Sequence, residues 1–130
     1  MSECKNFTGL FWSYNHYNKL NPDISQWDVH NVEYMGLMFK NCLEFNCDLS
    51  NWDLSSCRNT GQMFTDCHKF NQDISRWDVS KVEQANKMFK NAREFNQDIS
   101  KWKFHKLCNL AEIFEDCPIK EEYKPMQCRK

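Results

Sequence analysis

Phe70-Asn-Gln-Asp-Ile-Ser-Arg-Trp-Asp-Val79 is one of four closely similar stretches in this chain. The others are Leu20-Asn-Pro-Asp-Ile-Ser-Gln-Trp27, Phe45-Asn-Cys-Asp-Leu-Ser-Asn-Trp52 and Phe95-Asn-Gln-Asp-Ile-Ser-Lys-Trp102. Their tryptophans lie at positions 27, 52, 77 and 102, so the repeat is 25 residues long and has no insertion. A fixed period of roughly 20–50 residues is typical of a solenoid or a related array, in which equivalent residues of successive repeats become neighbours.

Size and charge limit the classes of protein to which this chain can belong. Its 130 residues form a single domain by size, residues 1–130, and the net charge of −1 gives no basic surface for nucleic acid. The first residues lack the basic segment and apolar run of a secretory signal, and no run reaches the roughly 18 apolar residues of a membrane helix. We therefore expect no nucleic-acid partner, no membrane insertion and an intracellular (cytoplasmic) location, with secretion by another route left open.

Eight cysteines in a short chain would suggest disulfides in a secreted protein, but their places in the repeat favour buried thiols. Five of them share positions of the repeat with alanine or valine, as buried cysteines often do: Cys4, Cys42, Cys57, Cys67 and Cys117. We therefore expect reduced thiols, with Cys47, Cys108 and Cys128 outside the core positions.

Apolar residues within one repeat follow two periodicities. Ile74, Trp77 and Val79 end with inward residues two apart, which predicts a strand over residues 74–79. Between Val82 and Ala92 the apolar residues recur every three or four positions, which predicts a helix over residues 82–92. One strand and one helix per 25 residues predicts an α/β solenoid of about five strand–helix coils.

The two ends of the chain depart from the regular repeats. Residues 1–20 are expected to form an N-terminal capping coil, in which Cys4, Phe7, Leu10, Tyr14, Tyr17 and Leu20 match Val29, Val32, Met35, Phe39, Cys42 and Phe45. Residues 21–117 carry the regular repeats. Residues 118–130, with Ile119, Tyr123 and Met126, are expected to fold over the last coil or to dock on a partner, because a terminal repeat exposes an apolar face.

The repeat closely resembles a known family. The wording Phe-Asn-Gln-Asp-Ile-Ser-x-Trp-Asp-Val-Ser-x-Val…Met-Phe is similar to the BspA-like leucine-rich repeat of bacterial surface proteins, mycoplasma lipoproteins and large DNA viruses, over about residues 4–117. The spacing of Ile74, Trp77 and Val79 also matches the leucine-rich pattern Leu-x-x-Leu-x-Leu. The resemblance implies a right-handed leucine-rich-repeat-like solenoid with an interaction or surface role and no known catalysis.

Stacked repeats would bring equivalent residues into ladders about 4.8 Å apart. We expect interior ladders of tryptophan and phenylalanine, formed by Trp27, Trp52, Trp77 and Trp102 and by Phe39, Phe64, Phe89 and Phe114. We expect a polar ladder of amides in the turns, which Asn21 begins and Asn46, Asn71 and Asn96 continue. Carboxylates repeat two residues later at Asp23, Asp48, Asp73 and Asp98, where they must accept local hydrogen bonds or, in the alternative reading, bind calcium.

Exposed residues supply the candidate interaction surfaces. A row at Asp28, Asp53 and Asp78 ends in Lys103 and lies beside Arg76 and Lys101. Phe11 and Trp12 are expected to be large apolar residues on the outside of the first coil, aligned with Gly36 and Leu37. Tyr123 in the tail is a further candidate contact.

The sequence contains no recognisable combination of catalytic residues. The four histidines share no position of the repeat, and three glycines are too few for a phosphate loop. We therefore expect no enzyme activity, no cofactor and no metal site. The expected function is a non-enzymatic protein-interaction or structural module with one or more protein partners, in one version a virion structural or assembly component bound to a capsid. The alternative is a surface adhesin-like module that binds host protein or glycan, and monomer and homo-oligomer both stay open.

Overall fold

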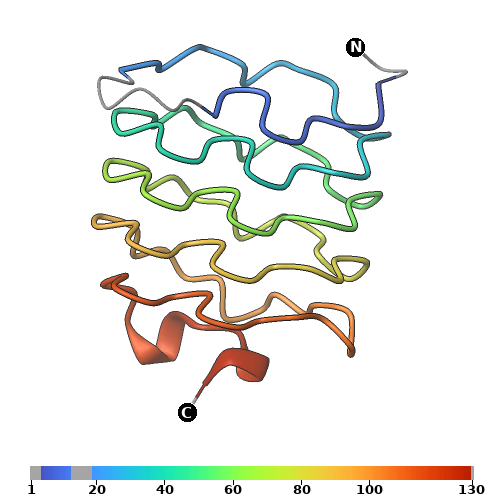
Figure 1. Cartoon of the computed structure of the whole chain (residues 1–130). Coiled ribbons are helices and arrows are strands. Elements are labelled where there is room, and N and C mark those ends of the chain that lie inside the picture. The colour runs from blue at the N-terminus through green and yellow to red at the C-terminus, as the bar shows by residue number, and fades with distance from the viewer. Residues whose placement is uncertain (1–3, 13–18, 130) are drawn as a thin grey trace.

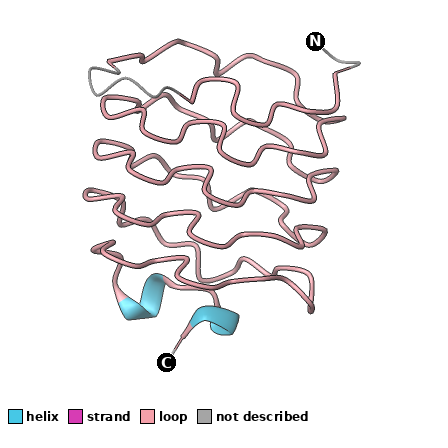
Figure 2. Cartoon of the chain, in the orientation of Figure 1, coloured by secondary structure: helices cyan, strands magenta, loops and turns pink. Residues whose placement is uncertain are grey.

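The fold is a stack of flat coils that run from the N-terminal end to the C-terminal end (Figure 1). The computed structural model describes residues 4–12 and 19–129. Isolated parallel bridges join successive levels at Asn6, Tyr34, Asn59, Gln84 and Asn109. Within the described residues, the regular helices are two short 3-10 helices near the C-terminus, η1 (Glu121–Tyr123) and η2 (Met126–Cys128), as Figure 2 shows.

The predicted α/β solenoid of strand–helix coils is wrong, because residues 82–92 form turns and not a helix. The N–H of Ala85 donates to the carbonyl of Asn109 in the next coil at 2.9 Å, and Lys87 N–H donates to Ala111 at 2.9 Å. Between them, Met88 N–H donates to the Ala85 carbonyl at 3.2 Å and closes a turn. In an α-helix these N–H groups would instead donate to the residue four positions earlier.

Left-handed backbone conformations produce this path. Each of the four complete repeats has two non-glycine residues with positive φ, four positions apart: Leu37 and Asn41, Gln62 and Asp66, Lys87 and Asn91, Glu112 and Asp116. A turn repeated every four residues buries the same positions as a helix does, so the apolar pattern fits both. The distance between adjacent coils distinguishes the turns from helices. The Phe64 and Phe89 ring centroids of adjacent coils are 5.5 Å apart. Helices with their side chains are about 10 Å wide and would lie farther apart than this.

The predicted strand over residues 74–79 is likewise replaced by turns, in which Trp77 N–H donates to the Ile74 carbonyl at 3.2 Å. On this side of the stack, side chains link the coils. The indole nitrogen of Trp77 donates to the Leu49 carbonyl at 2.9 Å, and that of Trp102 donates to the Ile74 carbonyl at 3.1 Å. The described residues therefore lack the strands and helices of a leucine-rich repeat, and the fold implied by that resemblance is corrected.

Aromatic rings fill the interior in columns. Phe39, Phe64, Phe89 and Phe114 stack with centroids 5.5–5.6 Å apart. A second column of Phe45, Phe70 and Phe95 runs beside it at 5.9–6.0 Å. Trp77 and Trp102 stack at 6.0 Å, whereas Trp27 is only partly buried against Phe7 and Phe11. The burial of each such ring contributes about 1.5–3 kcal/mol to the free energy of folding, so the columns hold the coils together.

The first coil is in a different register from the one that the sequence suggested. Asn6 bridges Tyr34, which is 34 − 6 = 28 positions later, while Tyr34, Asn59, Gln84 and Asn109 follow at intervals of 25. Phe11 N–H donates to the Met38 carbonyl at 2.9 Å, and the Phe11 ring stacks on Phe39 at 5.6 Å. Phe11 therefore matches Phe39 and not Gly36. The expected matches of Cys4, Phe7 and Leu10 are wrong by the same three positions, while Tyr14 and Tyr17 lie outside the described residues.

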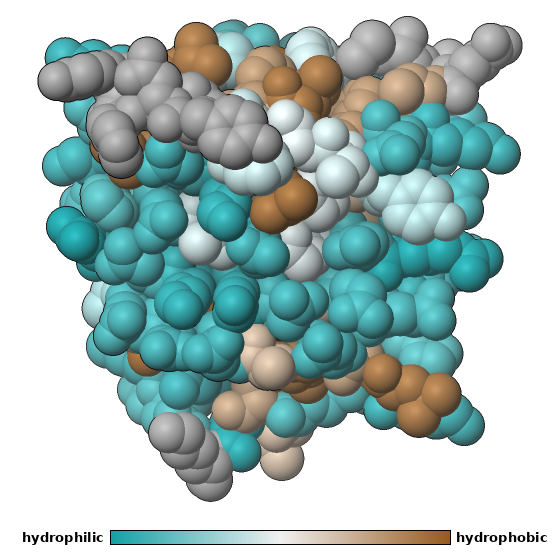
Figure 3. Space-filling model, in the orientation of Figure 1, coloured by the Kyte–Doolittle hydropathy of each residue, from teal (hydrophilic) through white to brown (hydrophobic). Residues whose placement is uncertain are grey.

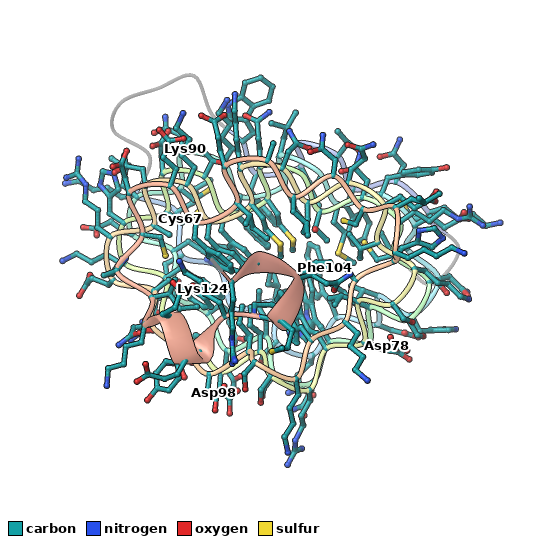
Figure 4. All side chains as sticks on the ribbon, turned by 90° about the horizontal axis from the view of Figure 1, so that it is seen from below. Cys67, Asp78, Lys90, Asp98, Phe104 and Lys124 are labelled. Carbon is teal, nitrogen blue, oxygen red and sulfur yellow. The ribbon has the colours of Figure 1, made fainter. Side chains whose placement is uncertain are left out.

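The C-terminal tail lies under part of the last coil (Figure 4). Ile99 N–H donates to the Tyr123 carbonyl at 3.0 Å. Phe104 and Gln127 exchange two hydrogen bonds: the Phe104 N–H donates to Gln127 Oε1 at 2.8 Å, and Gln127 Nε2 donates to the Phe104 carbonyl at 3.2 Å. Ile119 is buried against the core, whereas Met126 is exposed. The tail thus occupies a sixth level beneath one side of the stack.

Candidate protein-binding surfaces

The polar face is the side of the stack that carries two rows of aspartates, one at residues 23, 48, 73 and 98 and the other at residues 28, 53 and 78. In the first row each carboxylate accepts the N–H of the serine two residues later, at 2.9 Å for Asp48 and 3.0 Å for Asp73 and Asp98. Hydrogen bonds from Ser75 lower the pKa of Asp73, and those from Ser100 lower the pKa of Asp98. These side chains fix the turns and stay ionised.

The second row is built in the same way and is also exposed. Asp53 and Asp78 accept the N–H groups of Ser55 and Ser80 at 2.9 and 3.0 Å. Hydrogen bonds from these serines lower the pKa of each carboxyl. Asp28 instead bonds both the backbone N–H and the ring Nδ1 of His30. Lys103 continues the row as an exposed cation, so the row changes sign at its C-terminal end.

Basic residues and shallow hollows lie beside these rows. Arg76 and Lys101 are exposed at equivalent positions of neighbouring coils. A hollow of about 420 Å³ is lined by Asp73, Ser75, Arg76, Gln97, Asp98, Ser100 and Lys101. A second hollow, of about 290 Å³, is lined by Asp48, Ser50, Gln72, Asp73 and Arg76. Around the first hollow, the polar face therefore offers carboxylates and cations in alternation, at a spacing fixed by the stack.

The asparagine ladder has a structural role. Asn71 N–H donates to the side-chain oxygen of Asn46, and Asn96 N–H donates to that of Asn71, both at 2.9 Å. Asn46 N–H donates to Asn21 at 3.0 Å, and the Lys120 N–H donates to Asn96 at 2.9 Å. Each amide oxygen thus satisfies a backbone donor of the next coil, which leaves this oxygen in use within the fold.

Two apolar candidates from the sequence are less exposed than expected. Phe11 and Trp12 are both partly buried, and the ammonium of Lys40 lies 5.4 Å from the Trp12 ring centroid. Among the described residues of this end, Leu10 and Leu20 are exposed, at 47% and 50%. In Figure 3, hydrophobic atoms gather on the viewed surface near both ends of the stack. In the tail, Tyr123 is partly buried, with the Lys120 ammonium 5.3 Å from its ring.

A charged column that the sequence reasoning missed runs along another side of the stack. Arg58 lies 3.5 Å from Glu33 and 3.7 Å from Glu83, and Lys5 lies 3.8 Å from Glu33. The signal was present as alternating charge at one position of successive repeats. All four side chains are at least partly exposed, so each pair contributes only about 0–1 kcal/mol to stability.

Several cysteines lie in the core. Cys42, Cys47, Cys57 and Cys67 are buried, whereas Cys4 is exposed, so the expected places of Cys47 outside the core and of Cys4 within it were wrong. No disulfide links the cysteines in the described part of the chain. Burial raises the pKa of the Cys57 thiol to about 12, which disfavours the reactive thiolate.

The described residues form neither a cluster of metal-ligating side chains nor a membrane-spanning helix. Residues 4–12 and 19–129 contain no group of three or more histidine, cysteine or acidic side chains placed to hold a metal ion. Across the same residues, no helix is both long and apolar enough to cross a bilayer.

Comparison with known proteins identifies a family. The model of a family described as "Mycoplasma protein of unknown function, DUF285" matches residues 5–124. No curated protein and no solved structure matches the chain.

Proposed function

Since this chain belongs to the DUF285 family of Mycoplasma proteins of unknown function, we propose that it is a non-enzymatic protein-interaction module that binds a protein partner through the polar face. The observation that carries the proposal is the alternation of fixed carboxylates with exposed cations around the hollow between Asp73, Arg76, Asp98 and Lys101. Charge arranged in this way selects a partner with complementary charge and accelerates the encounter more than it adds affinity.

Rigidity supports this use of the surface. Asp73 and Asp98 are held by hydrogen bonds to backbone N–H groups, and the coils beneath them are joined by stacked rings. A partner would therefore bind groups that are already ordered, which reduces the entropy cost of association. Arg76 and Lys101 are long and exposed, so they supply the adjustable part of the contact.

Charge reversal tests the proposal. Arg76→Glu/Lys101→Glu removes both cations of the hollow, and Lys90→Glu is the matched control, because Figure 4 places Lys90 on the side away from Asp98. Cross-linked complexes are isolated from the source cells with the wild type and both variants. We expect one protein to be retained by the wild type and by Lys90→Glu and lost with the double variant. Retention of the same proteins by all three would reject the polar face as the binding surface.

Fractionation of the source cells distinguishes two narrower versions of the proposed function. Co-purification with a large particle supports a structural or assembly component, including one of a virion. The alternative, a surface module that binds host protein or glycan, is supported by the resemblance of the repeats to those of BspA-like surface proteins. Labelling of intact cells by a reagent that does not cross the membrane would favour that alternative, and the absence of labelling would count against it.

A further inference from the structure

The last coil presents a row of backbone donors that the other coils use for stacking. In the coil above it, the alternate residues Ala85, Lys87, Phe89 and Asn91 donate their N–H groups to the next level at 2.8–2.9 Å. The equivalent residues 25 positions later are Leu110, Glu112, Phe114 and Asp116. Within the described part of the chain, the N–H groups of these four residues have no hydrogen-bond acceptor. An open row of this kind is a template for pairing with another chain.

The C-terminal tail limits the size of a partner segment that can bind beneath the last coil. It covers the side of the last coil near Asp98 and leaves the side near Lys90 uncovered, as the view from below shows (Figure 4). A hollow of about 360 Å³ lies between the two, lined by Leu110, Glu112, Ile113, Phe114, Glu115, Lys124 and Cys128. Because η1 and η2 already occupy the sixth level, a whole second copy cannot stack flush on this end. A single extended segment beside the tail can complete the level.

Charge and shape indicate which segment fits. Glu112 and Glu115 are exposed carboxylates three residues apart, and their hydrogen bond and mutual repulsion raise the pKa of Glu115. In the coil above, Lys87 and Lys90 occupy the same two positions, and Lys87 already pairs with Glu112 at 3.8 Å. A further level with lysines at these positions would relieve the repulsion between the two carboxylates from the open side.

The Phe114 ring gives the segment an apolar anchor. It ends the column of stacked rings, since one face packs on Phe89 at 5.6 Å. The ring is only partly buried, and the Lys124 ammonium lies over it, 5.7 Å from its centroid. An aromatic side chain from an added segment would displace this ammonium and continue the column at the same spacing as the rings above.

We propose that residues 110–116, together with Lys124 and Cys128, form a docking groove for an extended segment of another protein. That segment offers backbone carbonyls at alternate residues and carries the pattern lysine, any residue, aromatic, lysine. The groove and the polar face are separate surfaces, so this inference does not depend on the function proposed above.

The test uses a synthetic peptide, Gln-Ala-Asn-Lys-Met-Phe-Lys-Asn-Ala, which copies residues 84–92. Backbone amide signals of the full-length protein are followed during titration with this peptide. We expect saturable shifts at Leu110, Glu112, Phe114 and Asp116, with slower hydrogen exchange of these four amides. A peptide with both lysines replaced by glutamate should bind about tenfold more weakly or worse.

A protein variant checks the same contact from the other side. Glu112→Lys/Glu115→Lys should lose the peptide while its melting temperature stays close to that of the wild type, because both side chains are exposed. Arg76→Glu/Lys101→Glu should bind the peptide normally, which distinguishes failure of the groove from failure of the polar face. Absence of saturable shifts, equal binding of both peptides, or protection of these amides by self-association would overturn the proposal.

Discussion

The indole nitrogen of Trp77 donates a 2.9 Å hydrogen bond to the carbonyl oxygen of Leu49, which lies 28 residues earlier. The same relationship joins Trp52 to Ile24 at 3.0 Å and Trp102 to Ile74 at 3.1 Å. The bonds lie on the side of the stack where side chains, and not backbone bridges, connect the coils. Each ring thus fills the core and satisfies a carbonyl of the preceding coil.

Trp77→Phe isolates the hydrogen-bond contribution of this ring. The variant keeps an aromatic ring but removes one of the two donors to the Leu49 carbonyl, which still accepts the Trp52 N–H at 3.0 Å, so the free energy of unfolding should fall by about 0.5–1.5 kcal/mol. Trp77→Ala also removes the buried ring and should cost about 3–5 kcal/mol. Urea denaturation measures both values.

Trp27→Phe is the matched control, because the Trp27 indole makes no hydrogen bond with the described residues and is partly exposed. Its cost should stay below about 1 kcal/mol. Equal losses for the Trp27 and Trp77 variants would contradict the role given to the indole nitrogen.

The asparagine ladder can be tested at its centre. Asn71→Ala removes the oxygen that accepts the Asn96 N–H and the Gln97 amide, and should lower the free energy of unfolding by about 1 kcal/mol. Asn71→Asp keeps an acceptor and should recover most of this loss. Thermal or urea unfolding reports the difference. An alanine variant as stable as the wild type would show that the asparagine ladder does not stabilise the stack.

The register of the first coil predicts different costs at two adjacent residues. Phe11 stacks on Phe39, so Phe11→Ala should lower the free energy of unfolding by about 1–2 kcal/mol. Leu10 is 47% exposed, so Leu10→Ala should cost clearly less. Urea midpoints at neutral pH compare the two, and a larger loss at Leu10 would support the alignment of Phe11 with Gly36 instead.

A pH-dependent contact links His30 to the polar face. Its hydrogen bond to Asp28, and then the charge of that carboxylate, raise the pKa of His30 above 6.5. Because the folded-state pKa is raised, the contact contributes to stability below about pH 6.5 and the contribution is lost as pH rises through the raised value. Titration of the ring signals should show a lower His30 pKa in Asp28→Asn and a smaller change in Asp53→Asn. Equal effects of the two variants would reject Asp28 as the main partner.

Much of the architecture could be predicted because the repeat has a strict period. The spacing of Trp77 and Trp102, or of Phe64 and Phe89, requires only that equal coils lie on one another, and the rings do stack. The family resemblance was correct in part, because the chain belongs to a family of Mycoplasma proteins. The identity of a partner for the proposed contact at the polar face could not be predicted, because the charges on one surface restrict but do not identify the surface that would bind them.

The local structure was predicted wrongly because Val82, Ala85, Phe89 and Ala92 fit a helix and a series of four-residue turns equally well. A discriminating signal was present in the sequence. Asparagine or aspartate stands at positions 41, 66, 91 and 116, and these residues tolerate the left-handed conformation that all four adopt.

The register of the first coil also had a signal. Leu10-Phe11 reads like Met38-Phe39 and Met63-Phe64, and Gly9 takes the left-handed conformation of Leu37. The alignment at a constant interval of 25 residues missed the three additional residues between the first and second coils.

Scalar couplings across hydrogen bonds test the stack of turns most directly. In the structure the Phe64 N–H donates to the Met88 carbonyl, 24 residues later, at 2.9 Å. A labelled sample should therefore show a correlation from the Phe64 amide nitrogen to the Met88 carbonyl carbon, and a second from Lys87 to Ala111. Correlations from Phe64 to Thr60 and from Lys87 to Glu83 would instead show helices and contradict the account.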